Sequence, residues 1–196
     1  MSRPSQGGRV GVVLSVDAGT TGVTVLLVTA EAEVIARGYA DFAQHFPRPG
    51  WVEHAPEEIW QATQTATRAA LDAAPDAVVR AVGITNQRET AVLWDRRTLA
   101  APRRAIVWQD RRTSAICERL ESAGHGPRVT ELTGLRLDPY FTGTKLTWLR
   151  ENDPRAWAGV QSGQVAVGTI DSYLVARMTS GAAHLTDASN ASRTLL

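Results

Sequence analysis

The string Asp17-Ala-Gly-Thr-Thr-Gly22 could bind phosphate, because it places small and hydroxyl-bearing residues in a turn. It lies between two apolar runs, Val10–Val16 and Val23–Val28. Backbone N–H groups and threonine hydroxyls in such a turn can donate to phosphate oxygens, and an aspartate at a strand end can hold a divalent metal through water. The same pattern also fits a plain glycine-containing β-turn whose aspartate caps its own backbone. Spacing alone leaves both interpretations open.

A second polar string, Thr85-Asn-Gln-Arg-Glu-Thr90, directly follows the run Val78–Thr85, which we expect to be a buried strand. Ligand sites of open α/β sheets lie at the ends of strands. Arg88 and Glu89 together provide a forked donor and a pair of acceptor oxygens, which suits two neighbouring hydroxyls of a polyol. The alternative is a solvated loop with a local ion pair worth about 0–1 kcal/mol.

Two further segments carry aromatic side chains next to polar ones. In Ile106-Val-Trp-Gln-Asp110, a strand would deliver Trp108 and then Asp110 into one cleft, although Trp108 also fits the core and Asp110 also fits a helix N-cap. Tyr140 lies in an irregular polar segment, where its ring and hydroxyl could close a pocket or anchor the loop.

Several other chemistries are excluded or disfavoured by the sequence. It contains no phosphate-binding G-x-x-x-x-G-K-[ST] loop, no G-x-G-x-x-G, no H-E-x-x-H and no G-x-S-x-G. A net charge of +1 without a long block of like charges argues against a nucleic acid or a membrane surface as partner. The single cysteine, Cys117, favours a reducing, cytoplasmic location. The four histidines show no ligand spacing, so we expect them on the surface or in loops: His45, His54, His125 and His184.

The elements that must position these residues alternate between strands and helices. Val10–Val16, Val23–Val28 and Glu33–Phe42 predict an antiparallel meander, and Pro56–Ala74 predicts a helix whose small buried stripe packs close to a sheet. Further strands are expected at Val78–Thr85, Ala91–Trp94, Arg104–Trp108 and Val165–Val167, and further helices at Asp110–Ser122, Lys145–Glu151 and Ile170–Met178. This order predicts an α/β fold, a mixed sheet with helices on both faces. We expect a frayed tail over residues 1–10 and one domain over residues 11–196.

Taken in order, the polar strings resemble the FGGY family of carbohydrate kinases. The strings that carry the resemblance are Asp17-Ala-Gly-Thr-Thr21, Pro49-Gly-Trp-Val-Glu-His54, Gly83-Ile-Thr-Asn-Gln-Arg-Glu-Thr90, Ile106-Val-Trp-Gln-Asp110, Asp138-Pro-Tyr140, Gly143-Thr-Lys145, Gly168-Thr-Ile-Asp171 and Asn190-Ala-Ser-Arg193. They span nearly the whole chain after the first ten residues. The string Asn86–Thr90 resembles the branch of the family that phosphorylates glycerol, rather than its xylulokinase-like relatives.

The resemblance implies the ribonuclease-H-like fold of actin, Hsp70 and hexokinase, with glycerol and MgATP meeting in a cleft. By matching motifs, the residues implied to bind glycerol are Arg88, Glu89, Trp108 and Tyr140. Those implied on the nucleotide side are Asp17, Gly19, Thr20 and Thr21, with Asp17 also positioning Mg²⁺.

The chain departs from the family pattern in its first motif and in its length. Ala18 stands where the family usually has Gln, and Gly22-Val-Thr24 stands where it has Ser-Ser-Arg, which removes a cation from the phosphate side. The aspartate implied as the catalytic base belongs to a Gly-Asp-Gln-Gln string that the 196 residues do not contain. We therefore expect the glycerol-binding half of a kinase, inactive alone and prone to self-association through uncovered apolar surface. The alternatives are the same half of another FGGY sugar kinase, or a non-catalytic domain.

Overall fold

The computed structural model describes residues 9–196 of the chain, which form two compact units. The first unit comprises the residues up to Phe42 together with Ile59–Asn86, and the second comprises Ala43–Glu58 together with Gln87–Leu196. Most of the predicted tail over residues 1–10 lies outside the described residues, and Val10 already belongs to a strand. The expectation of a single domain over residues 11–196 stays a prediction.

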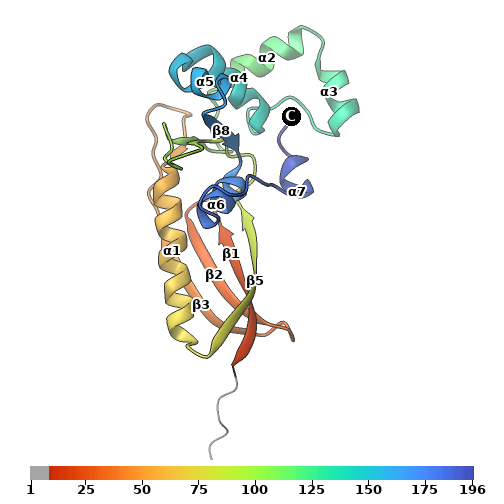
Figure 1. Cartoon of the computed structure of the whole chain (residues 1–196). Helices are drawn as coiled ribbons and strands as arrows, with labels where there is room; N and C mark the ends of the chain where they lie inside the picture. The colour runs from red at the N-terminus through yellow and green to blue at the C-terminus, as the bar shows by residue number, and fades with distance from the viewer. Residues whose placement is uncertain (1–8) are drawn as a thin grey trace, which may run out of the picture. The chain divides into compact units, whose positions relative to one another are not determined.

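The first unit is built on a four-stranded mixed sheet in the order β3-β2-β1-β5 (Figure 1). Strands β1 (Val10–Ala18), β2 (Gly22–Thr29) and β3 (Val34–Asp41) pair antiparallel, so the predicted meander is confirmed. Strand β5 (Ala77–Asn86) pairs parallel with β1. A parallel neighbour needs a crossover connection, and helix α1 (Pro56–Ala73) provides it.

Helix α1 lies against β3 because both elements carry very small residues where they meet. The helix buries Ile59, Ala66 and Ala70 completely, at the spacing that keeps them on one face. A Cβ added at Gly38 of β3 would lie 1.9 Å from the carbonyl oxygen of Ala66. The backbone of the helix therefore rests directly on the strand, which confirms the predicted close packing.

Our expectation that the strand before the Asn86–Thr90 string is buried was wrong. In β5 the side chains of Val79 and Val82 are 37% and 51% exposed. The strand forms the edge of the sheet as described, with β1 as its one neighbour in the strand order. An apolar, β-branched composition shows that a strand forms, but it does not show how many neighbours cover it.

The second unit holds two short antiparallel strand pairs and most of the helices. Strand β4 (Glu53–His54) pairs with β7 (Ala105–Ile106), and β6 (Val92–Asp95) pairs with β8 (Val165–Gly168). The helices are α2 (Ser114–Ser122), α3 (Gly126–Thr133), α4 (Thr142–Asn152), α5 (Pro154–Gln161), α6 (Ile170–Met178) and α7 (Ala188–Ala191). A small core of Leu93, Ile106, Leu149 and Ala156 joins the β6, β7, α4 and α5 elements.

Three of these helices, α3, α5 and α7, were not predicted. Pro127 stands in the first turn of α3, in a Gly- and Pro-containing segment for which we predicted no helix. Proline is favoured in the first turn of a helix, where its missing N–H has no partner to lose. Asp153 likewise caps α5 by accepting a hydrogen bond from the N–H of Ala156, directly before Pro154.

Candidate functional site

Glu89 is the centre of the site, because its charged side chain is buried and its backbone is held in an unusual conformation. Its φ is +65°, in the left-handed region, and its side chain is 2% exposed. Oε1 accepts a hydrogen bond from Nε of Arg193 at 2.9 Å. The second carboxylate oxygen, Oε2, forms no hydrogen bond with any residue that the structure describes. The pair thus leaves one acceptor for a ligand.

Arg193 is a site residue that the sequence reasoning missed as such. It follows α7, and its guanidinium carbon lies 5.8 Å from the ring centroid of Tyr140 and 5.1 Å from that of Phe141. The hydrogen bond to Glu89 raises the pKa of Arg193 above its ordinary value. The string Asn190–Arg193 contributed to the family resemblance, but nothing in its spacing indicated Glu89 as the partner.

Trp108 and Tyr140 form an aromatic pair next to this ion pair. Their ring centroids lie 5.5 Å apart with an interplanar angle of 63°, an edge-to-face arrangement. Both residues are half-buried. The backbone N–H of Trp108 donates to Oγ1 of Thr90, and the backbone N–H of Tyr140 donates to Oδ1 of Asp138. Through Arg193, the structure brings three of the four residues implied to bind glycerol together: Glu89, Trp108 and Tyr140.

Arg88, the fourth of these residues, precedes Glu89 and is exposed. It forms no ion pair with Glu89 or with any other carboxylate among residues 9–196. The alternative of a local Arg88–Glu89 ion pair is therefore wrong, since Glu89 pairs with Arg193 across 104 residues of sequence.

Asp110 neither faces a cleft with Trp108 nor caps a helix, so both of our interpretations of it were wrong. The N-cap of α2 is Thr113, and Asp110 is buried in an ion network with Arg112. Arg112 also pairs with Glu53, and its guanidinium carbon lies 3.8 Å from the ring centroid of Trp51. Asp110 is therefore a structural carboxylate that ties β4 and the loop before α2 together, since its Oδ2 accepts the N–H of Val52 at 2.6 Å.

The phosphate-binding candidates form a separate group in the first unit, at the turn between β1 and β2. Asp17 is exposed near the end of β1, and Thr20 and Thr21 follow in the turn. The N–H of Gly19 donates to the carbonyl of Gly22 at 3.0 Å, so it closes the turn. Gly19 would thus serve a phosphate by its missing side chain, which lets the ligand approach the backbone.

The turn fits a magnesium ion that is held mainly by nucleotide phosphates and water. Mg²⁺ keeps several waters and takes one or two protein carboxylates at phosphate sites, and exposed Asp17 can supply one. Among residues 9–196 no cluster of three or more His, Cys, Asp or Glu could hold a metal without such help. Val23, where the family pattern has a polar residue, points into the core and is fully buried.

His54 contradicts the expectation that all four histidines are surface or loop residues. It belongs to β4, is completely buried, and its Nδ1 lies 3.1 Å from Nε2 of Gln87. Burial lowers the pKa of His54 to about 4, with a smaller contribution from His45. The imidazole is therefore neutral at pH 7 and supports the loop that carries Glu89.

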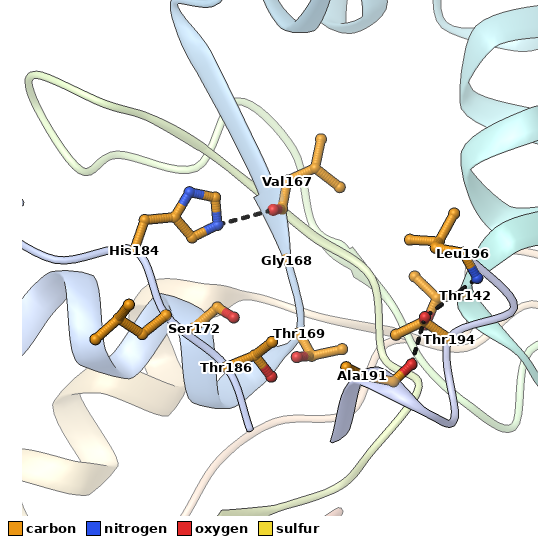
Figure 2. Close-up of a pocket in the computed structure, with 11 residues that line it drawn as sticks. Thr142, Val167, Gly168, Thr169, Ser172, His184, Thr186, Ala191, Thr194 and Leu196 are labelled. Atoms are coloured by element: carbon orange, nitrogen blue, oxygen red, sulfur yellow. Dashed lines mark hydrogen bonds between the residues drawn. The ribbon is translucent and has the colours of Figure 1, made fainter. Parts of the chain in front are cut away.

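A cavity of about 300 Å³ lies beside Thr142, whose Oγ1 donates to the carbonyl of Glu89 (Figure 2). Thr142 and Thr194 are among the 11 residues that line it, and none of the 11 is Lys, Arg, Asp or Glu. Figure 2 shows the ring of His184 turned to the carbonyl of Val167, with Nε2 and O 3.1 Å apart. The cavity thus offers no strongly charged partner to a phosphate group.

Comparison with known protein families identifies the family of the chain. Residues 12–196 match the model of the FGGY family of carbohydrate kinases, N-terminal domain. The chain belongs to this family. The match begins within β1 and includes both groups of candidate residues, so the resemblance inferred from the ordered strings is confirmed.

Curated FGGY relatives share about half of their aligned residues with this chain. It is 53% identical over 186 residues to a glycerol kinase from Methylobacterium nodulans, an alignment that covers 94% of this chain and 37% of the relative. It is 52% identical over 186 residues to a glycerol kinase from Rhodopseudomonas palustris, with the same coverage. The chain therefore spans little more than a third of the length of these relatives.

Solved structures confirm the predicted α/β fold with a mixed sheet, that of the actin- and hexokinase-like FGGY kinases. The crystal structure of Plasmodium falciparum glycerol kinase with ADP matches with a TM-score of 0.93 and 31% identity, over 98% of this chain and 38% of that one. A ligand-bound xylulose kinase from Lactobacillus acidophilus matches with a TM-score of 0.82 and 19% identity, over 94% of this chain and 36% of that one. The second likeness concerns the fold alone.

Proposed function

We propose that this chain supplies the glycerol-binding residues of an ATP-dependent glycerol kinase, which makes sn-glycerol 3-phosphate and ADP. The observation that carries the proposal is the buried Glu89 carboxylate, paired with Arg193 beside the edge-to-face rings of Trp108 and Tyr140. This combination offers charged hydrogen-bonding groups to hydroxyls and apolar ring surface to a carbon chain. A short polyol presents both hydroxyls and a carbon chain. The identity of about 50% to glycerol kinases supports the same substrate.

Each residue of the group has a separate role in the proposed complex. Oε2 of Glu89 accepts a hydrogen bond from one glycerol hydroxyl, and exposed Arg88 donates to another. The rings of Trp108 and Tyr140 pack against the carbon chain. Hydrogen bonds to charged groups contribute about 1.5–3 kcal/mol each, so loss of one weakens binding by roughly one to two orders of magnitude.

The proposed reaction needs positioning and charge neutralisation more than covalent catalysis. The oxygen of the 3-hydroxyl of glycerol forms a bond to the γ-phosphorus of ATP, and the bond from that phosphorus to the β–γ bridging oxygen breaks. Thr20 and Thr21 donate to phosphate oxygens, and Asp17 holds Mg²⁺, which neutralises phosphate charge when it is bound with ATP. The hydroxyl proton leaves to the aspartate of the Gly-Asp-Gln-Gln string, which the family resemblance implies and these 196 residues lack.

We also propose that the chain self-associates through the first unit and works in the cytoplasm, where ATP is the co-substrate. The side chains of Val10, Val13, Val79 and Val82 on β1 and β5 are all more than a third exposed. Exposed apolar side chains on outer strands favour association. No helix among residues 9–196 is both long and apolar enough to cross a membrane. Analytical ultracentrifugation tests association: a concentration-dependent oligomer supports it, and a monomer at all concentrations contradicts it.

A coupled assay for ADP formation tests the proposed function. All assays contain MgATP and one of the candidate substrates glycerol, xylulose, gluconate and ribulose. The chain is assayed by itself and in a mixture with the downstream part of the Methylobacterium nodulans relative. We expect no turnover by the chain alone and glycerol-dependent turnover by the mixture, lost in Glu89→Gln. Glu151→Gln removes a partly exposed carboxylate on α4 and is the matched control. A preference for another sugar, or full activity of Glu89→Gln, contradicts the proposal.

A further inference from the structure

The chain contains 20 arginines and one lysine, and that lysine is buried beside the site. Lys145 lies in the first turns of α4 and is 0% exposed. The other long cationic side chains of the sequence are all arginines. A lysine ammonium is a compact group with three donors, whereas a guanidinium is a flat fork.

The surroundings of Lys145 match three donors, because three backbone carbonyls surround its nitrogen. Nζ donates to the carbonyl of Glu89 at 3.3 Å, to that of Phe141 at 3.2 Å and to that of Tyr140. Side chains of a helix lean toward its N-terminus, which explains how Lys145 reaches back to the two residues that precede α4. The third carbonyl belongs to a loop 56 residues earlier in the sequence.

This arrangement is electrostatically unfavourable, so packing alone does not explain it. Nζ forms no ion pair with a carboxylate among residues 9–196, and it lies near the N-terminus of a helix, where the dipole disfavours a cation. Burial lowers the pKa of Lys145 to about 7, against the opposing charges of Asp110, Glu89 and Asp138 and the thiol of Cys117. An apolar residue such as Met would fill the same volume without this penalty.

One of the three carbonyls that Lys145 contacts belongs to a residue with a strained backbone, Glu89. Glu89 has a φ of +65°, which a residue with a side chain adopts only where its surroundings enforce it. Its carbonyl accepts from Lys145 and also from Oγ1 of Thr142 at 3.1 Å. Both donors lie in the first turns of α4, so one helix end fixes the orientation of the Glu89 side chain.

We propose that Lys145 is a positioning residue of the polyol site: its Nζ ties the backbone of Glu89 to that of Tyr140, so that the carboxylate and the aromatic ring face one ligand. The ligand is the short polyol of the proposed function, on which this assignment rests. Lys145 does not touch the polyol. Its effect on binding is transmitted through the two carbonyls.

The first test compares Lys145→Met with Arg119→Met in the 196-residue chain. Arg119 is 58% exposed and pairs with Glu151 of α4, so its variant removes one positive charge near the same helix but not the carbonyl contacts. Amide hydrogen exchange followed by mass spectrometry reports local order, and titration with glycerol reports affinity. We expect faster exchange over residues 88–90 and 138–142 and a glycerol dissociation constant at least tenfold higher in Lys145→Met, with neither change in Arg119→Met.

The outcomes separate this inference from the proposed function. If the unsubstituted chain does not bind glycerol, the proposed function fails, while faster exchange in both segments of Lys145→Met still supports the positioning of Glu89 and Tyr140. Unchanged exchange in both segments overturns the positioning role, whatever glycerol does. A merely structural role would accelerate exchange across the second unit rather than in these segments, and that result also overturns the proposal.

If Lys145→Met does not fold, NMR on the unsubstituted chain tests the role of Lys145 instead. Labelling with ¹³C-lysine gives a single lysine spin system, because the chain has one lysine. We expect its Cε signal to shift on addition of glycerol and not on addition of ethanol at equal concentration. A Cε signal that stays in place while glycerol binding is detected on the same sample overturns the proposal.

Discussion

The ion pair of Glu89 and Arg193 allows a quantitative test of the site, because one partner is buried and the other is partly exposed. The Glu89 side chain is 2% exposed and that of Arg193 is 32% exposed, with Nε and Oε1 2.9 Å apart. A hydrogen bond between charged groups contributes about 1.5–3 kcal/mol to stability. Because water reaches Arg193, we expect a coupling free energy of about 2 kcal/mol.

A double-mutant cycle measures this coupling in urea unfolding followed by tryptophan fluorescence. Arg193→Met leaves a buried carboxylate without its cation and destabilises the chain by about 2 kcal/mol or more, whereas Glu89→Gln leaves an arginine that water can solvate. In the double variant, Arg193→Met adds little to the effect of Glu89→Gln. The exposed pair Arg128–Glu131, with side chains 64% and 69% exposed, is the control, with an expected coupling below about 0.5 kcal/mol. A coupling for Glu89 and Arg193 no larger than that of the control refutes the reasoning.

Further predictions concern packing and pH. Gly38→Ala places a Cβ 1.9 Å from the carbonyl oxygen of Ala66 and should lower the free energy of unfolding by about 3 kcal/mol. Gly83→Ala should change it little, because apart from its chain neighbours no heavy atom of residues 9–196 lies within 4 Å of a Cβ added there. Equal effects of the two substitutions in urea unfolding contradict the packing of α1 on β3. The pKa of His54 is about 4 when folded and 6.5 when unfolded, so stability falls by up to about 3 kcal/mol as pH falls from 6.5 to 4, and His54→Gln should lack this loss. The pKa of Lys145 is about 7 when folded and 10.5 when unfolded, so the unfolded chain binds more protons between these values and stability rises with pH there; a Lys145→Met chain with the same slope contradicts this.

Local sequence patterns predicted the meander and the long helix because these elements depend on neighbouring residues. The apolar, β-branched run of β1 and the alanine stripe of α1 appear directly in the sequence. The alternation of buried Val12 with exposed Val13 does not, because both residues are valine. The exposure of β5 was not predictable, since it depends on whether another element pairs with the strand. Helices α3 and α5 were missed because a proline after a loop indicates a helix start as readily as a helix end.

The candidate site was predicted in part. The chemical character of Glu89, Trp108 and Tyr140 follows from residue type and from their positions after strands or in loops. Arg193 and Lys145 could not be connected to Glu89 from the sequence, because 104 and 56 residues separate the partners. A long-range pair of this kind leaves no periodic signal, and only the folded chain brings its members together.

The most direct test of the central claim, that Glu89, Trp108 and Tyr140 bind one glycerol molecule, is ligand-observed saturation-transfer NMR on the 196-residue chain. We predict a saturable glycerol signal from the unsubstituted chain. The glycerol dissociation constant should be at least tenfold higher in Glu89→Gln and unchanged in Glu151→Gln. A signal of equal affinity in the chain and in Glu89→Gln would contradict the account.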